Sequence, residues 1–229
     1  MASRRGAEEL IRSGRISIDG IPIRTVNHVV PMGSVVTLDG KSIEPEQRRL
    51  LIALNKPPGV VTTVKDPHGR PTVLDSLPDK YRDRRLVPVG RLDQDSCGLL
   101  LLSNDGDLIH ALLHPSRKVW KRYRVEVSGK ITSAVLDRLR ASVELDGRPT
   151  APAEVDLVKR LGPSQGVLEV AIREGRRRQI RRVCSKIGLR VTHLRRIGFG
   201  PIKLGNLPEG QCRALSTIEV ASLLEAGGL

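Results

Sequence analysis

The stretch that decides the fold runs from residue 90 to residue 106 and reads Gly90-Arg91-Leu92-Asp93-Gln94-Asp95-Ser96-Cys97-Gly98-Leu99-Leu100-Leu101-Leu102-Ser103-Asn104-Asp105-Gly106. Its four consecutive leucines lie between a glycine and the turn-forming sequence Asn-Asp-Gly. Such a run is typical of a strand buried on both faces, although a short apolar run is also compatible with a buried helix. We therefore expect Asp93 on a loop that enters the core.

A carboxylate beside apolar surface stays ionised only if a cation or several hydrogen-bond donors hold it, so Arg91 or another guanidinium is expected close to Asp93. A simple turn-forming role is the plainest interpretation of a loop aspartate. A calcium loop is rejected, because Cys97 stands at the fifth position and Asn104 stands where a bidentate glutamate must close the site.

The positive charge of the chain is concentrated in two segments. The 229 residues carry a formal net charge of +14 at pH 7. Residues 117–130 contain six basic residues and one acidic residue, and residues 173–196 contain ten basic residues and one acidic residue. Together, these two segments carry a net charge equal to that of the whole chain, whereas residues 1–46 are formally neutral. Focused charge of this kind favours a basic groove and a nucleic-acid partner over a surface that is merely well solvated.

Neither a metal site nor a disulfide framework is indicated. Cys97, Cys184 and Cys212 are widely spaced and form no Cys-x-x-Cys pair, which fits a reducing cytoplasm. His110 and His114 have a zinc-like i,i+4 spacing, but the glutamate of the metalloprotease motif is missing. We predict no metal, no cofactor, no membrane span and no signal peptide, and hence a soluble cytoplasmic protein.

The order of elements indicates a small N-terminal module followed by a larger domain. A short helix over residues 4–13 precedes two Asp-Gly hairpins at 16–23 and 35–41, and the polar residues 44–49 form the linker. Further on, the patterns predict strands near 50–54, 120–127, 152–158 and 166–172, and helices near 73–77, 108–114 and 131–141. If the segment that includes residues 174–184 is a helix, Ile180, Val183, Cys184 and Ile187 face the core.

Four motifs carry a resemblance to a known family. Gly90-Arg91-Leu92-Asp93 with the following Gly98 to Gly106 segment resembles the catalytic motif of the RsuA/RluB/RluE/RluF branch of the pseudouridine synthases. Three further motifs match in the same order: Asn55-Lys56-Pro57-Pro58-Gly59, the Lys-x-Tyr segment 121–123, and 175–181, which is similar to Gly-Arg-x-x-Gln-Ile-Arg. The resemblance covers nearly the whole chain.

The resemblance implies an α+β fold. It predicts an S4-like RNA-binding module at residues 1–43, a linker at 44–49, and a catalytic domain at 50–229 with a mixed, mostly antiparallel sheet. The helix that normally precedes Ser3-Arg4-Arg5 in the family is missing, so the module is expected to lack its first helix. The alternative is a structural hairpin appendage, which the neutral charge of residues 1–46 favours.

The resemblance also implies the reaction, the isomerisation of a uridine in ribosomal RNA to pseudouridine. The base is flipped out of its stack, its N–C glycosidic bond is broken, and the uracil turns and rejoins the ribose through C5. No redox group or metal is needed. The expected partner is ribosomal RNA or a ribosomal precursor particle. The match at 114–117 favours the large-subunit, RluB-type enzymes, and we expect a monomer.

Site residues follow from the matched motifs. Asp93 is expected to act at the ribose, either by attack on C1′ or by removal of the 2′ proton. Arg181 is predicted to hold Asp93 ionised and oriented, Tyr123 to stack on the uracil, and Ile180 to line its pocket, while Arg91 gives weaker support. Core packing is the alternative for Tyr123. The predicted RNA-binding residues are Lys56, Lys121, Arg176, Arg177 and Arg182, with a plain exposed lysine as the alternative for Lys56.

Two other functions compete with this interpretation. A non-catalytic rRNA-binding or ribosome-assembly protein explains the charge, but gives Asp93, Tyr123 and Arg181 no reason to occur together. A metal-dependent nuclease built on Asp93, Asp95 and the nearby Asp105 and Asp107 has carboxylates in plenty but little cationic support for them.

Overall fold

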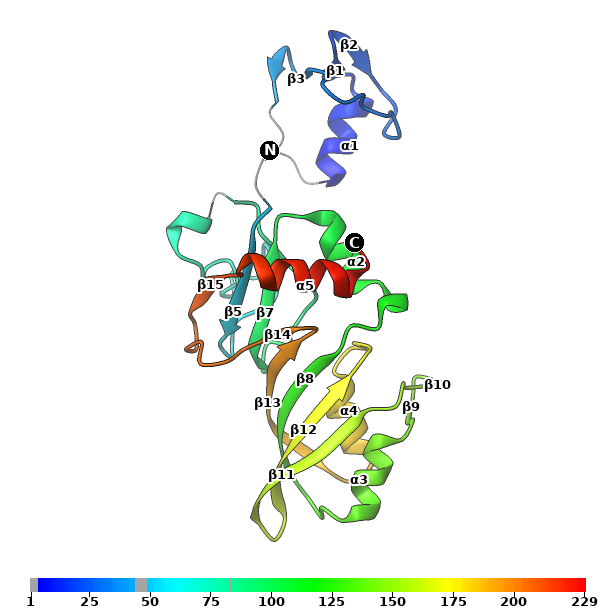
Figure 1. Ribbon diagram of the computed structural model, residues 1–229, viewed down its shortest axis with the longest axis vertical. Helices are drawn as coiled ribbons and strands as arrows, with labels where there is room; N and C mark the ends of the chain where they lie inside the picture. The colour runs from blue at the N-terminus through cyan, green and yellow to red at the C-terminus, as the bar shows by residue number, and fades with distance from the viewer. Residues whose placement is uncertain (1–3, 44–48, 83) are drawn as a thin grey trace. The chain divides into compact units, whose positions relative to one another are not determined.

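The computed structural model describes residues 4–43, 49–82 and 84–229 (Figure 1). The chain divides into two compact units, residues 1–48 and residues 49–229. Each unit contains its own β-sheet. Of the predicted linker 44–49, residues 44–48 lie outside the described residues, as does residue 3 of the predicted N-terminal motif.

The N-terminal unit combines one helix with a small antiparallel sheet. Its elements are α1 (Arg4–Arg12), β1 (Ile16–Ile18), β2 (Ile21–Ile23), β3 (Val36–Leu38) and β4 (Lys41–Ser42), with the strand order β2-β1-β3-β4. Both predicted hairpins are confirmed. Asp19 and Gly20 have φ of 48° and 83°, and Asp39 and Gly40 have φ of 49° and 78°, because a two-residue type I′ turn needs positive φ at both positions. Asp39 also forms an ion pair with Arg15.

The larger unit is built on one long sheet, and among its described residues nine strands take part. The path is β11-β12-β8-β13-β7-β5-β15, with β14 beside β13 and β6 beside β7. The β13–β7 pair is parallel, and the other strand pairs of this sheet are antiparallel. The strands are β5 (Leu51–Lys56), β6 (Val87–Pro88), β7 (Cys97–Ser103), β8 (Lys121–Ser128), β11 (Glu154–Gly162), β12 (Gln165–Ile172), β13 (Arg190–Phe199), β14 (Ile202–Lys203) and β15 (Cys212–Ala214).

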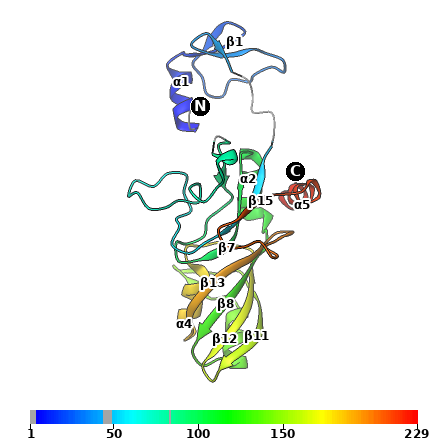
Figure 2. The ribbon, with the colours of Figure 1, turned by 90° about the vertical axis from the view of Figure 1, so that its left-hand side faces the viewer.

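Helices pack on both faces of this sheet, with α4 and α5 on opposite sides in Figure 2. The remaining elements are α2 (Gly106–Leu113), α3 (Ser133–Arg140), α4 (Gln179–Lys186), α5 (Thr217–Gly227), the 3₁₀ turns η1 (Asp79–Tyr81) and η2 (Pro115–Arg117), and the hairpin β9 (Glu144–Leu145) and β10 (Arg148–Pro149). The mixed, mostly antiparallel α+β architecture is therefore confirmed.

The leucine run explains why β7 lies in the middle of the unit. Leu100 and Leu102 belong to the core beneath α3 and α4, whereas Leu99 and Leu101 belong to the core beneath α2 and α5. All seven residues of β7 are buried. A strand covered on both faces reads as a continuous apolar run rather than an alternating one, so the predicted doubly buried strand is confirmed.

One predicted element was wrong. Residues 73–77 form turns rather than a helix, because Asp75 accepts hydrogen bonds from the amide and the hydroxyl of Thr72. Such a local side-chain bond offers the backbone an alternative to helical pairing. Val73 and Leu77 are still buried in the core.

None of the helices in residues 4–43, 49–82 and 84–229 has the length and apolar character that crossing a bilayer requires.

Candidate active site

Asp93 lies on the loop that joins β6 to β7, as predicted. Gly98 fixes where this loop enters the sheet. Its φ is 99°, and a Cβ atom placed on it would lie 2.3 Å from the carbonyl oxygen of Arg196. That close approach exists because Gly98 is paired with Arg196 across the parallel β7–β13 pair. Only glycine fits such a position. The pairing sets the Asp93 loop beside β13, the strand that follows α4.

Lys56 is hydrogen-bonded to the Asp93 loop inside the protein. This position corrects the prediction that Lys56 binds RNA. Its side chain is fully buried. The ammonium donates to the carbonyl oxygens of Pro57 at 2.9 Å and Ser96 at 2.8 Å, with Gln94 at 3.4 Å. Burial lowers the pKa of Lys56 to about 8. A lysine enclosed in this way cannot reach a phosphate, so its part is to tie the Asn-Lys-Pro-Pro-Gly segment to the Asp93 loop.

The second side of the site comes from the matched motif at residues 175–181, of which only the last three residues belong to a helix. Helix α4 begins at Gln179, and Arg178 just before it has the left-handed φ of 51°. Gln179 holds the preceding loop, because its side chain accepts from the amide of Arg176 at 3.0 Å and donates to Glu174 at 2.6 Å. The loop stays outside the helix for this reason, and Arg178 turns towards the Asp93 loop.

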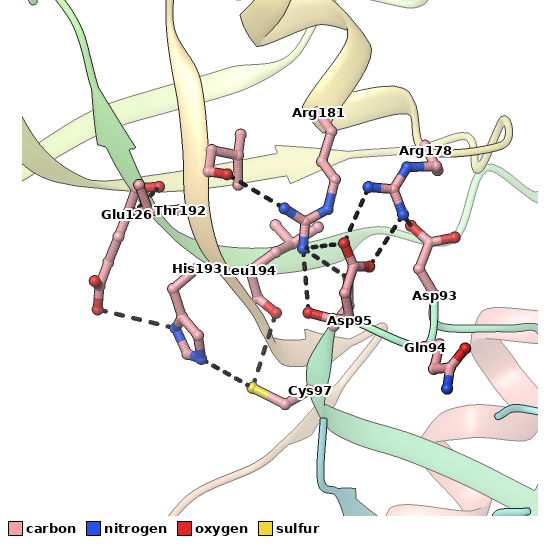
Figure 3. A network of polar contacts seen from close by, with 12 residues as sticks. Asp93, Gln94, Asp95, Cys97, Glu126, Arg178, Arg181, Thr192, His193 and Leu194 are labelled. Atoms are coloured by element: carbon pink, nitrogen blue, oxygen red, sulfur yellow. Dashed lines mark hydrogen bonds and ion pairs between the residues drawn. The ribbon is translucent and has the colours of Figure 1, made fainter. Parts of the chain in front are cut away.

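The ion pairs differ from the predicted Asp93–Arg181 pair (Figure 3). Arg178 lies 3.8 Å from a carboxylate oxygen of Asp93, and it donates two hydrogen bonds of 3.0 Å to Asp95. Arg181 instead pairs with Asp95 at 3.3 Å. It also donates to the Asp95 carbonyl oxygen at 3.2 Å. The cation beside Asp93 is therefore Arg178. Arg181 supports Arg178 indirectly, through Asp95, which both arginines bind.

Asp95 is the shared acceptor of both guanidinium groups. The hydrogen bonds from Arg178 lower the pKa of Asp95, and the charge of Arg181 lowers it further, against the opposing effect of burial. A carboxylate held by a two-point guanidinium contact is both ionised and oriented. Asp95 therefore fixes the position from which Arg178 faces Asp93.

Asp93 opens onto a cavity of about 520 Å³ that the predicted Arg91, Tyr123 and Ile180 also line, whereas Arg181 is not among its lining residues. Its walls combine apolar and basic side chains. Tyr123 and Ile180 are buried at its back, 8% and 6% exposed respectively. The lining consists of Arg91, Leu92, Asp93, Ser96, Tyr123, Ile172, Gly175, Arg176, Arg177, Arg178, Gln179, Ile180 and Leu194. A flat apolar wall beside a carboxylate and several cations suits a flipped base with its phosphate outside.

The other predicted RNA-binding residues have different surroundings. Arg177 is exposed at the rim of the cavity, and within the described part of the chain its guanidinium has no acidic partner. Arg176 donates to the carbonyl oxygens of Leu145, Arg148 and Pro149, so it holds the β9–β10 hairpin. Arg182 pairs with Asp146 of the same hairpin at 2.9 Å. Lys121 lies in a neighbouring cleft. Arg176 and Arg182 thus both hold the β9–β10 hairpin, and their contact with RNA stays a prediction.

Sequence reasoning missed several contributors to the cavity, among them Arg178, Leu92 and Leu194. Arg178 belongs to the matched motif, but only its left-handed backbone aims it at Asp93. Leu92 lies between Arg91 and Asp93 in the catalytic motif, so its place in the sequence could have indicated that it lines the cavity. Leu194 comes from β13 and carries no motif, so nothing in the sequence pointed to it.

The fold and this cavity define an RNA-modifying enzyme. The model of the RNA pseudouridylate synthase family matches residues 50–186, and the chain belongs to that family.

Relatives match along the full length. An uncharacterized RNA pseudouridine synthase of Aquifex aeolicus is 38% identical over 231 residues, covering all of this chain and 91% of that protein. The ribosomal large subunit pseudouridine synthase B of Escherichia coli K12 is also 38% identical, covering 97% of this chain and 78% of that protein. The crystal structure of a pseudouridylate synthase superposes with a TM-score of 0.70 at 26% identity, covering 96% of this chain and 94% of that one.

Proposed function

We propose that this RNA pseudouridine synthase modifies a uridine of ribosomal RNA, specifically of the large subunit. The full-length similarity to a ribosomal large subunit pseudouridine synthase supports this substrate. So does the basic charge of residues 117–130 and 173–196, because neutralising phosphates and releasing their counterions drives RNA binding. We further propose that the chain works as a monomer in the cytoplasm, on free rRNA or on a precursor particle.

Asp93 is proposed as the catalytic residue. The observation that carries this assignment is its carboxylate at the mouth of a cavity that Tyr123 and Ile180 also line, with Arg178 3.8 Å away. Arg178 positions the Asp93 carboxylate from 3.8 Å away. A carboxylate is the form needed both for attack on C1′ and for removal of the 2′ proton, since a protonated acid can do neither.

Tyr123 and Ile180 are proposed to hold the flipped uracil. The phenol ring offers a flat face on which a base can stack, and Ile180 closes the pocket from α4. Arg91 and Arg177, both exposed at the rim, are proposed to meet the phosphate of the flipped nucleotide itself. The uracil then turns within the pocket and rejoins the ribose through C5.

Residues 1–43 are proposed as an S4-like RNA-binding module, followed by the linker 44–49 and the catalytic domain 50–229. The small sheet of β1 to β4 beside α1 and the division of the chain after residue 48 support this assignment. The module would add a second contact to the RNA, and a tethered second contact raises affinity without changing the chemical step.

The experiment is to incubate the purified protein with unmodified transcripts of large- and small-subunit rRNA from the organism that encodes it, and to map the pseudouridines formed. We expect one or a few defined positions in the large-subunit RNA. Formation in the small-subunit RNA alone would contradict the proposed substrate. No pseudouridine in either RNA or in precursor particles would contradict rRNA as the substrate.

A further inference from the structure

A second cleft adjoins the active-site cavity. Its volume is about 760 Å³, and it shares Gly175 and Arg176 with the cavity at Asp93. Besides Arg176, four cationic residues line it from three separate segments. Lys121 begins β8 and Lys118 lies just before that strand, Arg148 lies on the β9–β10 hairpin, and Arg173 follows β12. These four residues and the space between them are called the basic cleft.

The charge of the basic cleft is unbalanced. Its one acidic lining residue, Glu174, is already engaged, because its carboxylate accepts from the amide of Ala151 at 3.1 Å and from Gln179 at 2.6 Å and lies 3.5 Å from Arg176. Throughout residues 4–43, 49–82 and 84–229, no carboxylate is paired with any of the four cations of the cleft.

This distinguishes the cleft from the neighbouring arginine cluster. Arg178, Arg181 and Arg182 each pair with an aspartate. Charges that are matched in this way gain little from an added anion, whereas unmatched cations converging on a cavity raise the local concentration of anions. The cleft is therefore suited to bind a negatively charged ligand.

Two of the cations are held in place by aromatic rings. The guanidinium of Arg173 lies 4.3 Å from the centre of the Trp120 ring, and the ammonium of Lys121 lies 5.6 Å from that of Phe199. Burial and, to a lesser extent, the nearby charge of Arg196 lower the pKa of Lys121 to about 8, against the opposing effect of Glu174. An ammonium that has lost part of its water gains more from an anion than an exposed one does.

The position of Lys121 links the cleft to the reaction. It precedes Tyr123 by two residues on β8, and alternate residues of a strand share one face. The two side chains therefore start roughly 7 Å apart on the same side of the sheet. An RNA strand that places its uracil against Tyr123 would pass its next nucleotide over Lys121.

We propose that the basic cleft binds the phosphodiester of the nucleotide that flanks the isomerised uridine, so that the RNA strand runs from the active-site cavity into the cleft. This inference rests on the proposed function and adds the direction in which the strand leaves the site. The cleft has no part in the chemical step. Its loss weakens RNA binding and leaves the turnover of bound RNA intact.

The test uses the full chain with the double substitution Arg148→Ala and Arg173→Ala. Both residues are exposed, so the fold tolerates their removal. Arg138→Ala with Lys159→Ala is the matched control, since it removes the same charge from exposed positions on α3 and β11 that line neither cavity. Lys118→Ala, a single exposed change, provides a second variant within the cleft.

Release of tritium from RNA labelled at uracil C5 gives KM and kcat, and RNA binding at several salt concentrations gives the salt slope. We expect the cleft variant to raise KM at least tenfold, to leave kcat within about twofold, and to make the salt slope shallower by about 0.7 for each phosphate that the variant no longer neutralises. Lys118→Ala should shift KM in the same direction by a smaller factor.

A KM and salt slope equal to those of the control pair would overturn the proposal, as would a loss confined to kcat. Failure of the proposed function is a separate result. In that case the wild type releases no tritium from any rRNA, while the binding measurements still compare the cleft variant with its control.

Discussion

Arg178 is expected to contribute directly to the reactivity of Asp93, and the structure gives the size of the effect. The two groups lie 3.8 Å apart, and their side chains are 41% and 31% exposed. At an effective dielectric constant of about 20, the attraction at this distance is roughly 4 kcal/mol, which is an upper bound. Exposed pairs retain only about 1 kcal/mol. For this half-buried pair we expect roughly 1.5 to 2 kcal/mol.

Arg178→Met keeps an unbranched apolar stem like that of arginine and removes the charged guanidinium. We expect a loss in kcat/KM of up to about 10- to 30-fold, the fold-change equivalent to the free energy above, because this attraction holds the Asp93 carboxylate in its reactive position. The assay is tritium release from C5-labelled RNA, run also at saturating RNA under single-turnover conditions so that a loss of binding is measured separately. Arg181→Met is the comparison, because Arg181 pairs with Asp95 and not with Asp93.

The reasoning is refuted if Arg178→Met stays within twofold of wild type in the single-turnover step while Arg181→Met loses tenfold or more. That result would make Arg181 the functional partner of Asp93 during the reaction.

Three further predictions concern folding and binding. Gly98→Ala should fail to give soluble protein, because its Cβ would collide with backbone; circular dichroism of a folded, soluble variant would contradict this. Arg213 lowers the pKa of Glu219 to about 2, so this carboxylate stabilises the fold by about 1 to 2 kcal/mol at pH 7. This contribution to stability is complete above about pH 4.5 and is lost as the pH falls towards 2. Glu219→Gln should therefore lower the melting temperature at pH 7, and its difference from wild type should shrink in acid. A difference in melting temperature that stays constant with pH would count against the Arg213–Glu219 pair. Removing residues 1–48 should leave single-turnover isomerisation intact and weaken rRNA binding modestly, whereas unchanged affinity and site choice would show that these residues serve structure alone.

Local patterns were sufficient to predict the elements that carry the site. The run Leu99 to Leu102 predicted a strand buried on both faces, because β7 packs against a core on each side. The two Asp-Gly pairs predicted their hairpins, because only that turn chemistry joins strands so tightly. The motif around Asp93 predicted its loop, and Tyr123 and Ile180 do line the same cavity as Asp93.

The pairing of charges could not be predicted in the same way. Choosing between Arg178 and Arg181 depends on one left-handed residue at the start of α4, and arginine rarely adopts that conformation. The burial of Lys56 depends on carbonyl groups from two separate segments that only the tertiary fold brings together. Long-range geometry, rather than residue type, decides both cases.

The geometry decides the choice of control for Asp93. Asp95, two residues away, is unsuitable, because it binds both Arg178 and Arg181. Replacing it would disturb the cation beside Asp93. Asp156 is a better control, because it is exposed on β11 and lines neither cavity.

The most direct measurement is tritium release by Asp93→Asn, compared with wild type and Asp156→Asn on rRNA labelled at uracil C5. Forming the new carbon–carbon bond at C5 must expel that hydrogen into water. Asparagine keeps the size of the side chain but removes its charge and basicity, while the phosphate contacts elsewhere remain. We predict that Asp93→Asn folds, binds the RNA with the salt dependence of wild type, and releases essentially no tritium, whereas Asp156→Asn behaves as wild type. Substantial release by Asp93→Asn would contradict the account.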